Sequence, residues 1–322
     1  MKRDIKIIEI NSINYEDDIF LYSFPVKFER ITESIKKVGL LNPIILFGCG
    51  DKYKIISGFK RFFAYKHLGY NDIDAFVFKS GSISDLEAFL ISIYDNIEIR
   101  ELNIIEKGNI LSKLKKRFNL NDNEIIGEYM PVLQLEPSKK LLYDFINLCK
   151  LDDDLKEHLI NRDVPIKVSS LLTSLSDENL KSISEIITKL NLGANKIKEL
   201  VTMIDEISKR DDVGIKKLLY DLKVIETLKN EKMTISQKWE RIICILKEKR
   251  FPTWNDIEKK IIRNISSLNL PPNIHFKFPS YLEGNKYTFE LEFSNSNELK
   301  NIGMKLIDIS ERKEFLELIE LI

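Results

Sequence analysis

The sequence predicts an α+β protein, with a small mixed α/β domain first, a long all-helical middle and a small α+β domain last. Short apolar runs broken by glycine turns alternate with helical periodicity over residues 1–100. Helical periodicity with capping residues then dominates residues 101–268. Residues 269–322 contain two runs of strict apolar–polar alternation followed by an amphipathic helix. These three ranges are the predicted domains.

Composition limits the class of protein. The 322 residues are 43% hydrophobic, enough for about two or three domains with real cores. No apolar run approaches the ~20 residues that a membrane-spanning helix needs, so we expect no membrane partner. The charged N-terminus has no signal-peptide pattern. The widely spaced Cys49, Cys149 and Cys244 indicate neither a disulfide framework nor zinc, and a cytoplasmic protein is expected.

Charge is balanced globally and uneven locally. Fifty basic and fifty acidic residues give zero net charge, so the chain lacks the basic excess of many nucleic-acid binders. From Lys27 to Lys66, however, nine Lys and Arg residues face three acidic ones, and from Lys107 to Arg117 five face none. Such patches are compatible with phosphate contacts and also with ordinary solvated faces.

The N-terminal elements are predicted in the order strand, strand, helix, strand, strand, helix, strand, helix. A glycine-rich turn at residues 48–51 joins the third and fourth strands, and Ser84 with Glu87 forms a capping-box pattern before the last helix. The predicted elements cover residues 5–10, 20–24, 32–39, 43–47, 52–56, 59–68, 73–78 and 84 onward.

The helix after Gly58 has an unusual first turn. Lys60 and Arg61 stand where the helix dipole is positive and acidic residues are favoured. A helix start with a preceding glycine, free amides and two cations suits an anion. The alternative is two ordinary exposed cations. If a ligand explains the arrangement, removal of Arg61 is expected to be neutral or slightly stabilising without that ligand.

The middle and C-terminal regions follow from helical and strand periodicity. The helical segments have no fixed repeat length, so no solenoid is predicted. They cover residues 103–118, 122–130, 138–149, 152–161, 177–190, 194–209, 212–229, 234–249 and 254–268. Strands at 274–278 and 287–293 precede helices from 297 and over 311–322. The position of this last domain suggests dimerisation.

Three boxes carry a family resemblance. Gly58, Arg61 and Ala64 match Gly-x-x-Arg-x-x-Ala, the glycine-arginine box of the ParB/sulfiredoxin-like domain. Residues 34–44 resemble that family's first box, a helix ending in Gly-Leu-Leu-Gln-Pro-Ile. Residues 94–106 resemble its Glu-Asn-x-Gln-Arg box and the Leu-Asn-Pro-x-Glu tail. The chain therefore resembles a divergent member of the ParB/RepB-type partition proteins.

The resemblance implies a site for CTP, or another nucleoside triphosphate, with Mg²⁺. Amides and cations would hold the phosphates and a carboxylate the metal. Asp95 takes the place of the family's metal-linked glutamate and is one methylene shorter; the alternative for Asp95 is a helix-end or turn aspartate. The implied nucleotide-binding residues are Gly39, Leu40, Asn42, Gly58, Lys60, Arg61 and Asn96.

Departures from the family pattern predict an altered pocket. Phe59 and Phe63 replace a Glu and an Arg, while Glu98 and Ile99 stand where the family has Gln and Arg. Arg100 comes one residue late and could substitute only by a local shift. Hydrolysis is therefore expected to be weak at most. The sulfiredoxin cysteine is absent from this glycine box, which excludes its thiol chemistry.

Residues 122–190 resemble the helix-turn-helix part of ParB-like proteins. Ser138, Lys139 and Lys140 open the expected recognition helix, which would lie in the major groove. The cluster Lys115, Lys116 and Arg117 is predicted to contact phosphates. A connection with two prolines and a largely apolar recognition helix leave open a helical scaffold that no longer reads DNA.

The predicted function is DNA binding gated by a nucleoside triphosphate, in partition or in plasmid- or phage-associated regulation. The resemblance implies double-stranded DNA, a homodimer, a ParA-like ATPase partner and a nucleoid location in the bacterial cytoplasm. Two alternatives stay open. One is a nucleotide-dependent phosphotransferase or hydrolase without DNA. The other is an interaction scaffold in which both sites have decayed.

Overall fold

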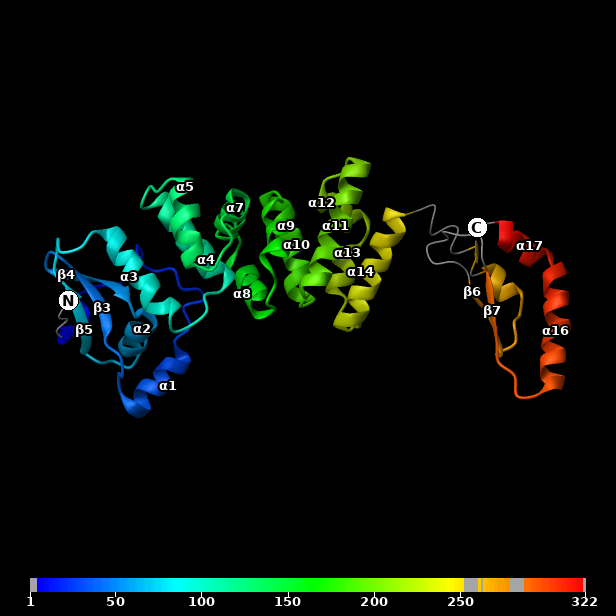
Figure 1. Ribbon diagram of the computed structural model, residues 1–322, viewed down its shortest axis with the longest axis horizontal. Helices are drawn as coiled ribbons and strands as arrows, with labels where there is room; N and C mark the ends of the chain where they lie inside the picture. The colour runs from blue at the N-terminus through cyan, green and yellow to red at the C-terminus, as the bar shows by residue number, and fades with distance from the viewer. Residues whose placement is uncertain (1–4, 252–259, 262, 278–286, 321–322) are drawn as a thin grey trace. The chain divides into compact units, whose positions relative to one another are not determined.

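The structure is a computed structural model that describes residues 5–251, 260–261, 263–277 and 287–320 (Figure 1). The chain divides into two compact units. One contains residues 1–202 with 214–216, and the other contains residues 203–213 with 217–322. The predicted α+β fold class, with a small mixed α/β domain first, is confirmed, while the domain boundaries near residues 100 and 268 stay predictions.

A five-stranded sheet begins the first unit. Its strand order is β1-β5-β3-β4-β2. The central strand β3 pairs antiparallel with β4 and parallel with β5, and β1 and β2 form the two edges. The strands are β1 (Ile5–Glu9), β2 (Ile13–Asn14), β3 (Ile44–Cys49), β4 (Lys52–Ser57) and β5 (Asp72–Phe78).

Three helices accompany this sheet: α1 (Glu29–Val38), α2 (Phe59–His67) and α3 (Asp85–Ile97). α2 packs against β3 and α3 against β4, and α1 packs on α2 (Figure 1). The predicted capping box of Ser84 and Glu87 is confirmed. The fully buried side chains of Leu46, Phe62 and Phe89 belong to this core.

Two N-terminal predictions were wrong. Residues 20–24 form no strand; Phe20 and Tyr22 are buried from a loop, so alternate burial imitated strand periodicity. Helix α1 begins at Glu29 and not at Thr32. Thr32 lies inside the helix, where its Oγ1 donates to the carbonyl of Phe28 at 2.9 Å and needs no capping position.

The helices that follow in the first unit closely match the predicted segments. N-caps at Asn103, Ser138 and Asp152 begin three of them. The 166–173 helix was missed, since it has only eight residues and follows a proline N-cap. They are α4 (Ile104–Lys116), α5 (Asp122–Glu124), the π-helical η2 (Ile125–Tyr129), α6 (Met130–Val132), α7 (Lys139–Leu148), α8 (Asp153–Asn161), α9 (Ile166–Thr173) and α10 (Asp177–Lys189).

Helices α4 and α7 pack closely because of a glycine. A Cβ atom at Gly108 would lie 2.5 Å from the carbonyl oxygen of Phe145. Helix α11 (Ala194–Asp211) then crosses the boundary between the two units. The helix predicted over 212–229 is two helices, α12 (Ile215–Asp221) and α13 (Val224–Lys229), since Lys223 has a left-handed φ of 54°.

The second unit continues with α14 (Ile235–Arg250). Of the helix predicted over 254–268, residues 260–261 and 263–267 are helical, and residues 254–259 and 262 lie outside the described residues. The two predicted strands are present as β6 (Ile274–Lys277) and β7 (Thr288–Leu291), and the structure pairs them antiparallel. Helices α16 (Ser296–Glu311) and α17 (Lys313–Glu320) follow. Ile261, Leu268 and Ile309 form its small buried cluster. Across the described part of the chain, no helix has the length and apolarity to span a bilayer.

Candidate functional site

A pocket of about 270 Å³ lies where the start of α2, the loop after β2 and the end of α3 meet. Its wall combines apolar side chains with hydroxyls, an amide and the cations of Lys60, Arg61 and Arg100. The lining residues are Phe20, Tyr22, Ser23, Ile31, Ile56, Ser57, Gly58, Phe59, Lys60, Arg61, Ser92, Asn96 and Arg100.

Gly58 is required at the start of α2. Its φ is +101°, and a Cβ atom there would lie 2.7 Å from Cγ2 of the buried Ile44. It is the N-cap residue and supplies no side-chain cap, and the first helical turn contains no acidic residue. The helix therefore presents its N-terminal amides and its positive dipole end at the pocket.

The two cations of that turn are only partly solvated. Burial lowers the pKa of Lys60 and of Arg61, and the attraction of Glu106 and of Asp95, respectively, offsets this in part. Neither cation has an ion-pair partner within 4 Å among the described residues. Both groups therefore retain charge that a bound anion could neutralise.

Arg61 connects the predicted first box to the glycine box. Its Nη1 donates to the carbonyl oxygens of Asn42, at 2.7 Å, and of Pro43, at 2.8 Å. The predicted residues of the first box, Gly39, Leu40 and Asn42, thus lie in the segment after α1 that Arg61 anchors. They do not line the pocket. Gly39 ends α1 with a φ of +73°.

Asp95 and Asn96 lie in the last turn of α3 and share a hydroxyl partner. Ser57 Oγ donates to Asp95 Oδ2 at 2.5 Å and accepts from Asn96 Nδ2 at 3.4 Å. Asp95 is thus a helix-end aspartate, at the end where the dipole disfavours a carboxylate. In the described ranges no three His, Cys, Asp or Glu side chains form a metal cluster. Asp95 does not line the pocket and reaches its wall through Ser57. Mg²⁺ commonly uses one or two carboxylates plus substrate phosphates, which is the use that Asp95 could serve there.

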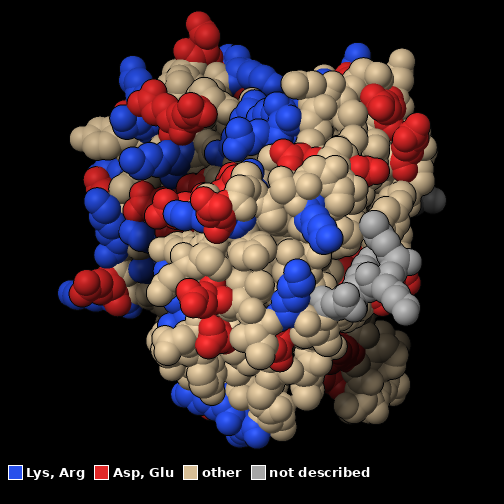
Figure 2. Space-filling view, turned by 90° about the vertical axis from the view of Figure 1, so that its left-hand side faces the viewer, with Lys and Arg blue, Asp and Glu red and all other residues tan. Residues whose placement is uncertain are grey.

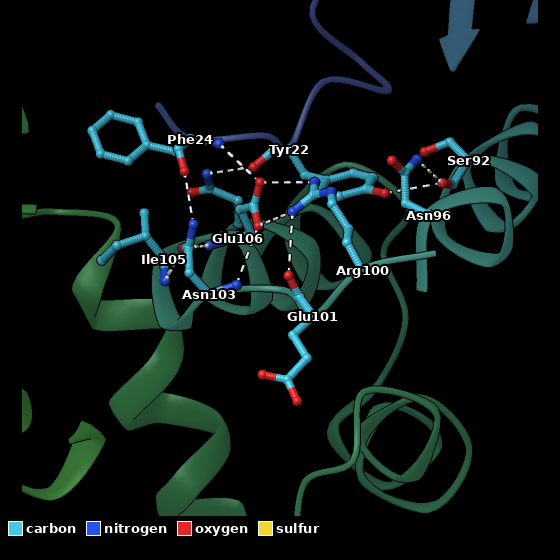
Figure 3. Close-up of polar contacts among 10 residues, drawn as sticks. Tyr22, Phe24, Ser92, Asn96, Arg100, Glu101, Asn103, Ile105 and Glu106 are labelled. Atoms are coloured by element: carbon cyan, nitrogen blue, oxygen red, sulfur yellow. Dashed lines mark hydrogen bonds and ion pairs between the residues drawn. The ribbon is translucent and has the colours of Figure 1, made fainter. Parts of the chain in front are cut away.

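Arg100 enters the pocket although the sequence places it one residue late. Its Nη1 and Nη2 donate to Glu106 Oε2 and Oε1 at 2.6 and 2.9 Å (Figure 3). The Glu106 side chain is 1% exposed and also accepts from the backbone N–H of Asn103 at the start of α4. Burial opposes the charge of Arg100, but the bond to Glu106 raises its pKa overall. The pair fixes the guanidinium at the pocket wall.

Comparison with known protein families identifies the part of the chain that contains the sheet. Residues 3–97 match the family model of the ParB N-terminal domain. The chain contains a ParB N-terminal domain. The predicted resemblance to the ParB domain is thereby confirmed. The five-stranded sheet lies within the matched residues, and so do all the pocket residues except Arg100.

Similar proteins extend the match beyond the ParB domain. A nucleoid occlusion protein of Geobacillus sp. (strain WCH70) is 27% identical over 166 residues, which are 51% of this chain and 56% of that protein. One of Bacillus thuringiensis (strain Al Hakam) is 25% identical over 210 residues, 64% of this chain and 68% of that protein. The chain thus spans little more than half the length of the Geobacillus relative.

Two solved structures of a C-terminally truncated ParB from Caulobacter crescentus also match. The one complexed to the centromeric parS site is 18% identical, covering 61% of this chain and 98% of that chain with a TM-score of 0.35. The one complexed with CTP-γ-S is 19% identical, covering 56% of this chain and 98% of that chain with a TM-score of 0.27.

The departures from the family boxes have different roles in the ParB domain. Phe59 is buried and lines the pocket. Phe63 does not line it; its ring packs against those of Phe28 and Tyr15, with centroids 6.1 and 6.3 Å away. The phenylalanine at the family's arginine position therefore supports an aromatic cluster.

Five polar residues of the pocket were not among the site residues predicted from the sequence. They are Tyr22, Ser23, Ser57, Ser92 and Arg100, of which only Arg100 was considered, as a substitute after a local shift. A helical period could have found two of them, because Ser92 and Arg100 lie four residues before and after Asn96. Tyr22 had no such signal, since it reaches the pocket from a loop.

Many of the predicted DNA-binding cations are paired. Asp122 forms ion pairs with Lys115 and with Lys139, the latter at 3.8 Å. Arg117 lies 3.7 Å from Asp18. Ser138 N-caps α7 by accepting from the N–H of Leu141 at 3.4 Å. Lys116 and Lys140 are exposed.

The face of the molecule in Figure 2 has no uniformly basic surface. Acidic side chains are interspersed among Lys and Arg there. Because Asp122 also pairs with Lys115 and Lys139, contacts to DNA phosphates are expected from single exposed lysines and not from one continuous basic patch.

Proposed function

We propose that this chain is a DNA-associated ParB-type protein whose ParB domain binds a nucleoside triphosphate, CTP first among them, with Mg²⁺. The pocket carries this proposal. It combines an uncapped helix N-terminus at Gly58 with two half-buried cations that have no acidic partner among the described residues. Together these features suit a polyanion.

The volume of the pocket favours the phosphate part of such a ligand. About 270 Å³ is just below the roughly 300–1,000 Å³ of small-molecule sites. Lys60, Arg100 and the free N–H groups of Arg61 would neutralise and orient the phosphates. Asn96 would donate to them from the end of α3 by exchanging its 3.4 Å bond to Ser57. Arg61 would act twice, because Nη1 already holds the carbonyls of residues 42 and 43.

Asp95 would hold Mg²⁺ together with the phosphates. The metal would neutralise phosphate charge, and the resident Ser57–Asp95 hydrogen bond would be shared with it or replaced by it. No described residue of the pocket stands out as a base for hydrolysis, so binding and gating, with at most a weak triphosphatase activity, are proposed.

Binding tests this directly. We expect CTP with Mg²⁺ to raise the melting temperature of the full chain, and expect GTP and ATP to raise it less. Asp95→Ala should lose the magnesium-dependent part of the affinity in calorimetric titration, while Glu98→Ala, an exposed acidic control after α3, should keep it. If none of the three nucleotides stabilises the wild-type protein with Mg²⁺ present, the nucleotide proposal fails.

DNA binding rests on the relatives and on α7. The similar proteins are nucleoid occlusion proteins. Ser138 is the N-cap of α7, and the exposed Lys139 and Lys140 are the first residues of this helix. We propose that α7 is the recognition helix of a helix-turn-helix, that the chain acts at the bacterial nucleoid as a homodimer, and that a ParA-like ATPase is a partner. Fluorescence anisotropy with duplex DNA, with and without CTP and Mg²⁺, measures the gating. Identical affinity in both conditions would contradict it.

A further inference from the structure

Ser92 is a buried polar residue in the pocket wall without a visible role. It is 1% exposed, and its Oγ has no hydrogen-bond partner among the described residues. Buried hydroxyls usually have one, so each exception needs a reason. Because Ser92 lines the pocket beside α2, that reason can be a ligand.

The backbone around Ser92 is held in place. Its carbonyl oxygen accepts from the Tyr22 hydroxyl at 2.9 Å and from Asn96 Nδ2 at 2.8 Å (Figure 3). The backbone N–H of Arg100 donates to the carbonyl of Asn96 at 3.0 Å, which continues the helical turn. Ser92, Asn96 and Arg100 therefore present a hydroxyl, an amide and a guanidinium along one side of α3 and its end.

The charges nearby indicate which ligand atom the hydroxyl would meet. Lys60, Arg61 and Arg100 line the same pocket, and the carboxylate of Glu106 is already engaged by Arg100. An oxygen atom that enters among these groups should carry negative charge. A serine O–H can donate to such an oxygen, which the backbone carbonyls of the site cannot do.

We propose that Ser92 Oγ donates a hydrogen bond to a phosphate oxygen of the bound nucleotide. This rests on the proposed function, and it adds a contact outside the boxes that the sequence resembles. The hydroxyl is left unpaired in the free protein and gains its partner from the ligand.

The unpaired hydroxyl predicts effects of opposite sign. Ser92→Ala removes a buried polar group without a partner, so the melting temperature without ligand should stay unchanged or rise. The same change removes a ligand contact, so affinity should fall by about 10- to 150-fold, the range for one hydrogen bond to a charged group. Ser92→Cys keeps most of the volume with a weak donor and should also lose affinity.

Ser169 provides a matched control. It is also a buried helical serine of the first unit, but its Oγ donates to the carbonyl of Pro165 at 3.2 Å. Ser169→Ala should therefore lower the melting temperature and leave nucleotide affinity unchanged.

The experiment titrates the full-length wild type and these variants with CTP, inorganic tripolyphosphate and cytidine, each with Mg²⁺. Ser92→Ala should lose the same factor for CTP and for tripolyphosphate and nothing for cytidine. If the wild type binds CTP, and Ser92→Ala binds both CTP and tripolyphosphate with the affinity of the wild type, this inference fails while the proposed function stands. The same conclusion follows if Ser92→Ala loses affinity for cytidine. If the wild type binds neither phosphate compound, both fail.

Discussion

Replacing Arg61 by alanine should lower the unfolding free energy of the free protein and also its affinity for nucleotide. In the structure, Arg61 Nη1 donates to the carbonyl oxygens of Asn42 and Pro43. A hydrogen bond from a charged donor contributes about 1.5–3 kcal/mol. Water can replace the one to the exposed Asn42, so we count only the bond to Pro43. The dipole conflict that is relieved returns about 0.3–1 kcal/mol.

The expected net loss of unfolding free energy is therefore about 0.5–2.7 kcal/mol, a fall of roughly 1–11 °C in melting temperature for a unit of this size. This changes the expectation from the sequence alone, in which Arg61→Ala is neutral or slightly stabilising without ligand. The dipole conflict could be read locally, whereas the two carbonyl acceptors lie eighteen and nineteen residues earlier.

Thermal and urea denaturation with and without CTP and Mg²⁺ measure both effects. Arg61→Ala should also lose about one to two orders of magnitude in CTP affinity, the equivalent of one charge-assisted bond. Arg30→Ala, an exposed arginine of α1, is the matched control and should change neither quantity. A variant with the melting temperature and CTP affinity of the wild type would refute the reasoning from the Arg61 geometry.

Other predictions concern neighbouring residues. Gly58→Ala should lose more than about 1 kcal/mol of unfolding free energy, and more than Gly39→Ala, whose Cβ would enter open space at a similarly positive φ; equal losses would contradict the Ile44 clash. Burial lowers the pKa of Lys60, so its charge costs stability in full below that lowered pKa, and the cost disappears as pH rises from it to the ordinary lysine pKa of 10.5. Lys60→Met should therefore raise the melting temperature at pH 7 and weaken CTP binding; a fall in melting temperature would contradict this. Neutralising the exposed Lys116 and Lys140 should flatten the salt dependence of DNA binding by up to about 2 in log–log slope, and an unchanged slope would exclude them as phosphate contacts.

Local signals explain what could be predicted. Hydrophobic period and capping residues act over a few positions, so the strands and helices around Gly58 and the capping box at Ser84 were predictable from neighbouring residues. The same signals failed at residues 20–24, where Tyr22 is buried by contacts with α3 and not by strand pairing. A short period of alternating burial does not say what buries the residues.

The sequence by itself determined that a glycine-led helix with two cations follows a strand in a ParB domain, because that pattern is contiguous. Only the tertiary structure decided the partners. It holds Arg100 at the pocket through hydrogen bonds to Glu106 and leaves the Ser92 hydroxyl without a hydrogen-bond partner among the described residues. It also pairs Lys115 and Lys139 with Asp122. These outcomes depend on which distant side chains compete for one acceptor once the helices pack, and that competition has no periodic trace in the chain.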